Sequence, residues 1–243
     1  MSSARDRLHA RLHAEGLDWL VPDWDAPATI VAVSTTRCGR EGAVASFLPS
    51  PPVYLRQVHG TRVVEIDGTS RAEALAESPA ADAAIAREPG IAVAVRSADC
   101  LPVLFADRRG TVVAAAHAGW RGLAAGVLES TVGAMGVAAH DVVAWIGPAI
   151  GPRRFEVGRD VYDAYVDADA GDAACFAPHR DGKWLADLPG LARRRLANVG
   201  VHAVAGGRWC TVEDAARFHS WRRDRGTGRM ATAIAIEKRQ AEA

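Results

Sequence analysis

The feature that most constrains the fold is a run of three strand-length apolar segments separated by short turns. These segments cover residues 91–97, 101–106 and 111–117, with a turn at residues 107–110. Apolar runs of this length, bounded by turn residues, are typical of buried β-strands. We therefore expect this part of the chain to lie in the core of the fold.

Helices and further strands are predicted on both sides of this segment. Leucine spacing predicts an amphipathic helix in the first twenty residues, and further helices are predicted over residues 118–135, 160–168 and 188–198. Short strands are predicted over residues 29–36, 53–57, 62–66, 142–146, 201–204 and 231–237, the last with the alternation of an edge or half-buried strand. With neither an internal repeat nor a low-complexity linker, this mixture favours a single α/β (α+β) domain over residues 1–243, with layers of sheet and helix, rather than two domains.

Charge balance and the apolar segments exclude several classes of partner. Lys plus Arg and Asp plus Glu each number 29, so no basic surface of the kind that DNA or an anionic membrane selects is expected. The first twenty residues lack the apolar core of a secretory signal, and no apolar run approaches the roughly 18 residues that span a bilayer. We expect a cytoplasmic protein with neither nucleic acid nor membrane as partner.

Three residues at predicted strand ends are candidates for a metal site. The four cysteines have no CxxC spacing, which favours reduced thiols, and one of them, Cys100, has His59 and His117 as candidate partners. Two imidazoles and a thiolate suit zinc or copper, and three protein ligands with an open fourth position are typical of a catalytic zinc. Two alternatives stay open on the residues alone: hydrogen-bonded histidines beside a buried thiol, and a metal-free Cys–His nucleophilic pair.

Two arginine-containing segments are candidates for binding an anion. A helix that begins near Gly119 leaves free backbone N–H groups beside Arg121, although Gly119 and Gly122 also suit close packing of a strand and a helix. Near the C-terminal end, five arginines cluster around two glycines: Arg217, Arg222, Arg223, Arg225 and Arg229. Guanidinium groups on such a turn hold phosphate or carboxylate, and the alternative is a solvated turn before the last strand.

Five ordered motifs carry a resemblance to a known family. They are RQVHG (56–60), ADCLPVLFAD (98–107), HAGWRG (117–122), IGPAIGP followed by FEVG (146–158), and CT followed by RRD and TGRM (210–230). In this order they resemble the laccase-domain purine nucleoside phosphorylases, also labelled multicopper polyphenol oxidoreductases or peptidoglycan editing factors. The resemblance implies a layered mixed β-sheet sandwich with helices outside, similar to a cysteine-hydrolase-like bacterial toxin domain. It also implies zinc, or sometimes copper, held by His59, Cys100 and His117.

The resemblance implies an enzyme, and two substrate classes remain open. One reaction is phosphorolysis of adenosine, inosine or methylthioadenosine, with deamination of adenosine as a second activity. The other is amide hydrolysis that removes a wrong amino acid from a muramyl nucleotide of peptidoglycan synthesis. A single cluster of two histidines and one cysteine offers no trinuclear copper centre, which disfavours phenol oxidation. A metal-binding protein without catalysis is the remaining alternative.

Residue roles follow from these reactions. The expected catalytic residues are Cys100, His117 and Asp99, and the expected substrate-binding residues are Arg121, Glu156, Arg222 and Arg223. Asp99 or Glu156 is expected to protonate the leaving purine, and the arginines are expected to hold phosphate.

One segment departs from the family pattern. Family members usually carry an Asn-Leu-Gly motif and an Asn-Arg pair between the first strand and QVHG, whereas residues 37–52 are short and contain no Asn. Because the missing Arg is implied in binding substrate or phosphate, we expect phosphorolysis to be weaker than hydrolysis or deamination.

Overall fold

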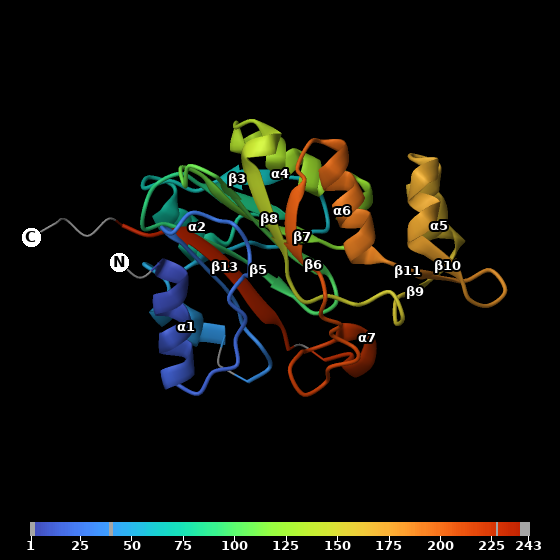
Figure 1. Ribbon diagram of the computed structural model, residues 1–243, viewed down its shortest axis with the longest axis horizontal. Helices are drawn as coiled ribbons and strands as arrows, with labels where there is room; N and C mark the ends of the chain where they lie inside the picture. Colours follow the sequence, from blue (N-terminus) through green and yellow to red (C-terminus); the bar gives the residue numbers. More distant parts are fainter. Residues whose placement is uncertain (1–2, 39–40, 227, 239–243) are drawn as a thin grey trace, which may run out of the picture.

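The computed structural model describes residues 3–38, 41–226 and 228–238, so residues 39–40 of the segment 37–52 and Thr227 of the TGRM motif lie outside the described residues. Two β-sheets form its centre (Figure 1), with strand orders β12-β8-β6-β7-β4-β3 and β1-β13-β5-β2. The larger sheet consists of Ala203–Gly206, Val142–Ile146, Leu101–Asp107, Val113–Ala118, Ala83–Ala86 and Val63–Glu65, in that order. The smaller consists of Ile30–Ser34, Met230–Ile236, Ala92–Ser97 and Val53–Tyr54. A third sheet, β10-β11-β9, contains Phe176–Pro178, Trp184–Ala186 and Glu156–Val157.

Helices cover the outer faces of both central sheets. Helix α1 (Ala4–Ala14) and the 3-10 helix η1 (Glu41–Phe47) pack on the smaller sheet, whereas α4 (Val127–Met135) and α6 (Leu188–Asn198) pack on the larger. The other helical segments are α2 (Arg71–Glu77), α3 (Trp120–Ala124), η2 (Ala139–Asp141), α5 (Arg159–Val166), η3 (Ala170–Cys175) and α7 (Trp221–Asp224). Apolar clusters fill the space between the sheets and under each helical layer. This arrangement confirms the predicted α/β class with sheets inside and helices outside.

The three apolar segments of the central sequence form β5, β6 and β7, as predicted. Strands β6 and β7 are antiparallel neighbours in the larger sheet, but β5 belongs to the smaller one. The chain therefore crosses from one sheet to the other between Ser97 and Leu101. Asp99 takes a left-handed conformation there, with φ of 88°. This crossover places Cys100 where both sheets end.

Two predicted elements differ from those observed. The helix predicted over residues 118–135 is interrupted, because Gly126 between α3 and α4 has a φ of 97°. The last strand, β13, is central and fully buried rather than an edge. Its alternation reflects two different apolar surroundings: Ile234 and Ile236 face the space between the sheets, whereas Ala233 and Ala235 face the α1 layer.

The predicted leading helix is confirmed but shorter than expected. Ser3 and Asp6 form a reciprocal capping box at the start of α1, and Leu8 and Leu12 are buried beneath it. The helix ends before Gly16, which has a φ of 68°, so the later leucines of the pattern lie beyond it. Across the described ranges, no helix combines the length and apolar character needed to cross a bilayer.

Candidate metal centre and pocket

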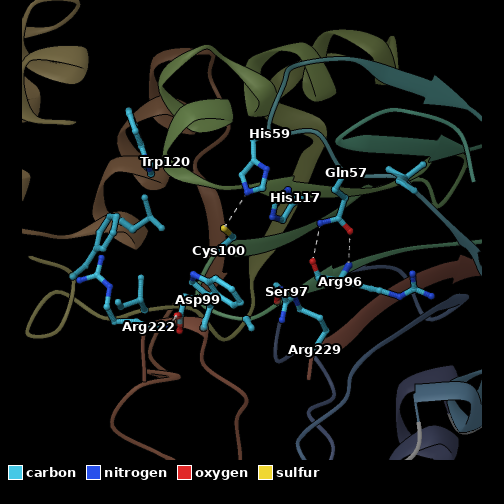
Figure 2. Close-up of a pocket in the computed structure, with 16 residues that line it drawn as sticks. Gln57, His59, Arg96, Ser97, Asp99, Cys100, His117, Trp120, Arg222 and Arg229 are labelled. Carbon is cyan, nitrogen blue, oxygen red and sulfur yellow. Dashed lines mark hydrogen bonds between the residues drawn. The ribbon is translucent and has the colours of Figure 1, made fainter. Parts of the chain in front are cut away.

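A pocket of about 490 Å³ lies where the two central sheets end, and His59, Cys100 and His117 line it (Figure 2). The other lining residues are Leu55, Gln57, Arg96, Ser97, Ala98, Asp99, Trp120, Ile150, Phe155, Leu188, Trp221, Arg222 and Arg229. Its volume lies in the range of roughly 300–1,000 Å³ that small-molecule sites occupy. Apolar walls with a few converging polar groups are typical of such sites.

The three predicted ligands converge from separate elements. His59 lies in the loop between β2 and β3, Cys100 lies at the crossover, and His117 lies in β7. Their donor atoms all lie within 4.8 Å of one another, and Nε2 of His59 is 3.9 Å from Sγ of Cys100. The two imidazole rings meet nearly edge to face, with centroids 4.9 Å apart.

This donor set fits a metal ion. Sulfur and nitrogen donors on one tetrahedral zinc lie roughly 3.5 Å apart, given bonds of about 2.3 Å and about 2.0 Å. The observed separation between His59 and Cys100 is close to that value. Thiolate and imidazole suit zinc and copper alike.

Asp82, which the motifs did not single out, holds two of the three ligands. One oxygen, Oδ1, accepts hydrogen bonds from Nδ1 of His117 and the backbone N–H of His59, both at 2.9 Å. The other, Oδ2, accepts from the N–H groups of Val58 and Gly60 at 3.1 and 2.7 Å. This fully buried carboxylate stabilises the loop in which His59 has a φ of 60°. It also turns Nε2 of His117 toward the thiol, as partners of metal-binding histidines do.

The glycines of HAGWRG let the backbone approach the cluster closely. A Cβ on Gly119 would lie 2.7 Å from Cδ2 of His59 and 3.1 Å from Sγ of Cys100. One on Gly122 would lie 2.9 Å from the carbonyl oxygen of Gly60. Helix α3 contains five residues, and the guanidinium of Arg121 lies 4.3 Å from the ring centroid of Trp120. The packing alternative for these glycines is therefore favoured over an anion site.

The electrostatics of the metal-free cluster favour a thiolate beside an imidazolium. Burial opposes ionisation of Cys100, but hydrogen bonds from His117 and His59 outweigh it and lower the thiol pKa to about 6. Burial likewise opposes charge on His117, but hydrogen bonds to Asp82 and Cys100 raise its pKa. Cys100 would hold a metal ion as a thiolate, and His117 would hold it as a neutral imidazole after losing a proton.

Asp99 lies on the pocket wall, and its carboxylate acts as an acceptor. Oδ1 accepts from the hydroxyl of Thr211 at 2.5 Å, and Oδ2 accepts from the hydroxyl of Ser220 at 3.1 Å and the N–H of Arg222 at 2.6 Å. The residue adjoining Cys100 thus holds the start of α7, whose Trp221 and Arg222 line the pocket.

Of the four predicted substrate-binding residues, Arg222 lines the pocket, whereas Arg121, Glu156 and Arg223 are not among its described lining residues. Arg223 donates to the carbonyl groups of Thr211, Val212 and Phe218, which is a structural role. A hydrogen bond from Arg180 lowers the pKa of Glu156 and keeps that carboxylate ionised. Of the five clustered arginines, Arg222 and Arg229 reach the pocket.

Several pocket residues were not predicted. The side chain of Gln57 donates to the carbonyl of Arg96 and accepts from its N–H, both at 2.8 Å, and so holds the end of β5. Gln57 lies within the RQVHG motif, which was a usable signal. The sequence signal for Asp82 was weaker: it is the only charged residue in the Ala-rich stretch 80–86.

Fold and site together define the class of protein. Residues 31–237 match the family described as multi-copper polyphenol oxidoreductase laccase, and the chain belongs to that family. Within the described residues, one group of three or more potential ligands lies close enough to hold an ion: His59, Cys100 and His117.

Individual relatives share most of the chain. The purine nucleoside phosphorylase YfiH of Escherichia coli K12 is 46% identical over 242 residues, covering 88% of this chain and 97% of its own length. The purine nucleoside phosphorylase PA4543 of Pseudomonas aeruginosa is 44% identical over 245 residues, covering 90% and 98%. The crystal structure of Neisseria meningitidis protein NMB0706 matches with a TM-score of 0.86 at 43% identity, covering 91% of this chain and all of that one.

Proposed function

We propose that this protein is a metal-dependent purine nucleoside phosphorylase, with zinc or copper held by His59, Cys100 and His117. The observation that carries the proposal is the convergence of these three side chains in a pocket large enough for a nucleoside. The names of the related proteins in Escherichia coli and Pseudomonas aeruginosa support the reaction class. Deamination of adenosine is proposed as a second activity of the same site.

Bound at this position, an ion supplies Lewis-acid chemistry: it polarises a substrate oxygen and lowers the pKa of a water molecule. The side chains around it bind and orient the substrate. Trp120, Phe155 and Trp221 offer flat apolar surfaces on which a purine stacks. Arg222 stands beside Phe155, with its guanidinium 5.6 Å from the ring centroid, and supplies positive charge on that wall.

The proposed role of Asp99 is to position α7 rather than to donate a proton. Both oxygens of its carboxylate accept hydrogen bonds, from Thr211, Ser220 and Arg222 at the start of α7. Glu156 is a poor acid because the hydrogen bond from Arg180 lowers its pKa. In this proposal His117 and Cys100 contribute to the reaction as ligands of the ion, together with His59.

A second candidate function is amide hydrolysis on a muramyl nucleotide. The observation that favours it is the chain of contacts from Cys100 to His117 to Asp82, a thiol, imidazole and carboxylate in the order that thiol hydrolases use. Either activity requires a small-molecule substrate in the same pocket.

Product analysis separates the two reactions. Metal-loaded protein is incubated with adenosine plus phosphate, and both metal-loaded and metal-free protein are incubated separately with a serine-bearing muramyl nucleotide; the products are resolved by chromatography. Adenine together with ribose 1-phosphate supports the phosphorylase. Free serine supports the amide hydrolase, and unchanged substrate in every incubation contradicts both proposals.

A further inference from the structure

A buried hydroxyl group faces the pocket without a protein partner. Ser97, the last residue of β5, is 2% exposed and lines the pocket, and its Oγ has no hydrogen-bond partner among the described residues. Burying a hydroxyl without a partner costs stability, so such groups are rare in folded proteins. A hydroxyl at a pocket wall gains its partner when a ligand binds.

Strand alternation fixes the direction in which Ser97 points. Val95 and Ser97 share one face of β5, and Val95 lies in the apolar cluster between the sheets. Arg96 points to the opposite face, where its guanidinium lies 4.0 Å from the ring centroid of Tyr54. Ser97 therefore faces the inner end of the sandwich, where the pocket opens. Arg96 also lines the pocket, but its guanidinium lies over Tyr54.

A cation stands next to this hydroxyl. Ser97 is the register partner of Met230 in β13, so Arg229 directly precedes the facing residue. Figure 2 shows Ser97 and Arg229 on the same side of the pocket. Nη1 of Arg229 donates to the carbonyl oxygens of Gly226 and Gly228 at 3.2 and 2.9 Å, and its guanidinium lies 5.7 Å from the ring centroid of Trp221.

These contacts hold the guanidinium in place through one nitrogen. Among the described residues, the hydrogen bonds of the Arg229 side chain are made by Nη1, which leaves Nε and Nη2 for a ligand. A fixed guanidinium edge beside a hydroxyl donor matches the oxygens of a phosphoryl group. Cys100 follows Ser97 by three residues, so a group bound here lies close to the ligand cluster.

We propose that Ser97 and Arg229 form the subsite for a phosphoryl group in this pocket. The inference rests on the proposed function, because that reaction consumes phosphate. The chemistry fits two sources: inorganic phosphate as co-substrate, or the 5′-phosphate of a nucleotide substrate. In both cases the hydroxyl and the guanidinium donate to phosphoryl oxygens.

The test uses Ser97→Ala and Arg229→Gln, with phosphorolysis of inosine measured at varied phosphate. Each substitution removes a hydrogen bond to a charged ligand, so KM for phosphate is expected to rise about tenfold. KM for inosine is expected to change little. Ser97→Ala is also expected to leave Tm unchanged or higher, because it removes a buried hydroxyl that has no partner among the described residues.

Two matched variants control for indirect effects. Ser34 is also buried in a sheet, but its hydroxyl pairs with that of Thr232 at 2.8 Å, so Ser34→Ala should lower Tm and leave KM for phosphate unchanged. Arg225 also lies over Trp221 but is not a described lining residue of the pocket, so Arg225→Gln should leave KM for phosphate unchanged.

Calorimetric titration of the metal-loaded protein separates this proposal from the phosphorylase proposal. Inorganic phosphate and adenosine 5′-monophosphate are titrated into wild type and both variants, whether or not inosine is cleaved. A fall of about tenfold in the affinity for one of these ligands, seen in both variants, supports the subsite. The ligand whose affinity falls identifies the source of the phosphoryl group. Equal affinities in wild type and variants overturn the proposal, as does a loss of Tm in Ser97→Ala that matches Ser34→Ala.

Discussion

Replacing Asp82 by Asn is expected to weaken metal binding through the loop and ring that this carboxylate holds. Its two oxygens accept four hydrogen bonds, from Val58, His59, Gly60 and Nδ1 of His117. The Asn side chain has one oxygen in place of two, so two of these hydrogen bonds are lost. Its NH2 group then faces the two donors that the missing oxygen had accepted from. Hydrogen bonds to a charged group contribute about 1.5–3 kcal/mol each, so the free energy of unfolding should fall by about 3–6 kcal/mol. Zinc affinity should fall about 10–100-fold.

Urea denaturation measures the first effect, and competition for zinc against a chromophoric chelator measures the second. Asp107→Asn is the matched control, because Asp107 is also buried and accepts from the N–H groups of Arg109, Thr111 and Val112. It should lose comparable stability and keep its zinc affinity. Folded Asp82→Asn that binds zinc as wild type does would refute the reasoning, as would an equal loss of affinity in Asp107→Asn.

Two further predictions concern the cluster itself. In metal-free protein, the pKa of Cys100 is lowered to about 6, so the thiolate is present above that pH. Alkylation by iodoacetamide, mapped by mass spectrometry, should be rapid at pH 7, slow as the pH falls below about 6, and be blocked by zinc. A midpoint near ~8.5, that of an ordinary thiol, would contradict this. Gly119→Ala places a Cβ 2.7 Å from Cδ2 of His59, so zinc affinity should fall while far-ultraviolet circular dichroism stays unchanged. Unchanged zinc affinity in Gly119→Ala would contradict this prediction, because the loop that carries His59 would then move aside without cost.

The elements that could be predicted are those whose burial follows from the pattern of apolar and turn residues within the element itself. Strands β5, β6 and β7 were predictable because each is a continuous apolar run with turn residues at its ends. The central position of β13 was not, since Ala and Ile alternate there between two apolar layers rather than between core and water. The strands of the third sheet contain two or three residues each, too few for a period to show.

The candidate site was predictable where a motif carried its chemistry. His59, Cys100 and His117 each lie in a motif and were expected to share an ion. Asp82 acts through contacts with residues 23 and 35 positions away, which no local pattern shows. The sequence did not distinguish Arg223 from Arg222. The fold directs Arg223 toward backbone carbonyl groups, whereas Arg222 lines the pocket.

The expected weakness of phosphorolysis depends on where phosphate ligands lie. That expectation rested on the missing Asn-Arg pair in residues 37–52, and none of the described residues of this segment lines the pocket. Ser97 instead ends β5, and Arg229 directly precedes β13, the neighbouring strand of the smaller sheet. If they bind phosphate as proposed, phosphorolysis proceeds without that segment.

The central claim is that His59, Cys100 and His117 hold an ion that the reaction requires. The most direct measurement is a zinc titration of metal-free protein, with bound zinc and phosphate-dependent release of hypoxanthine from inosine followed in the same samples. We predict that both rise together and level off at about one zinc per chain, and that Cys100→Ser shows neither. Full activity in the metal-free protein, or saturated zinc with no hypoxanthine released, would contradict the account.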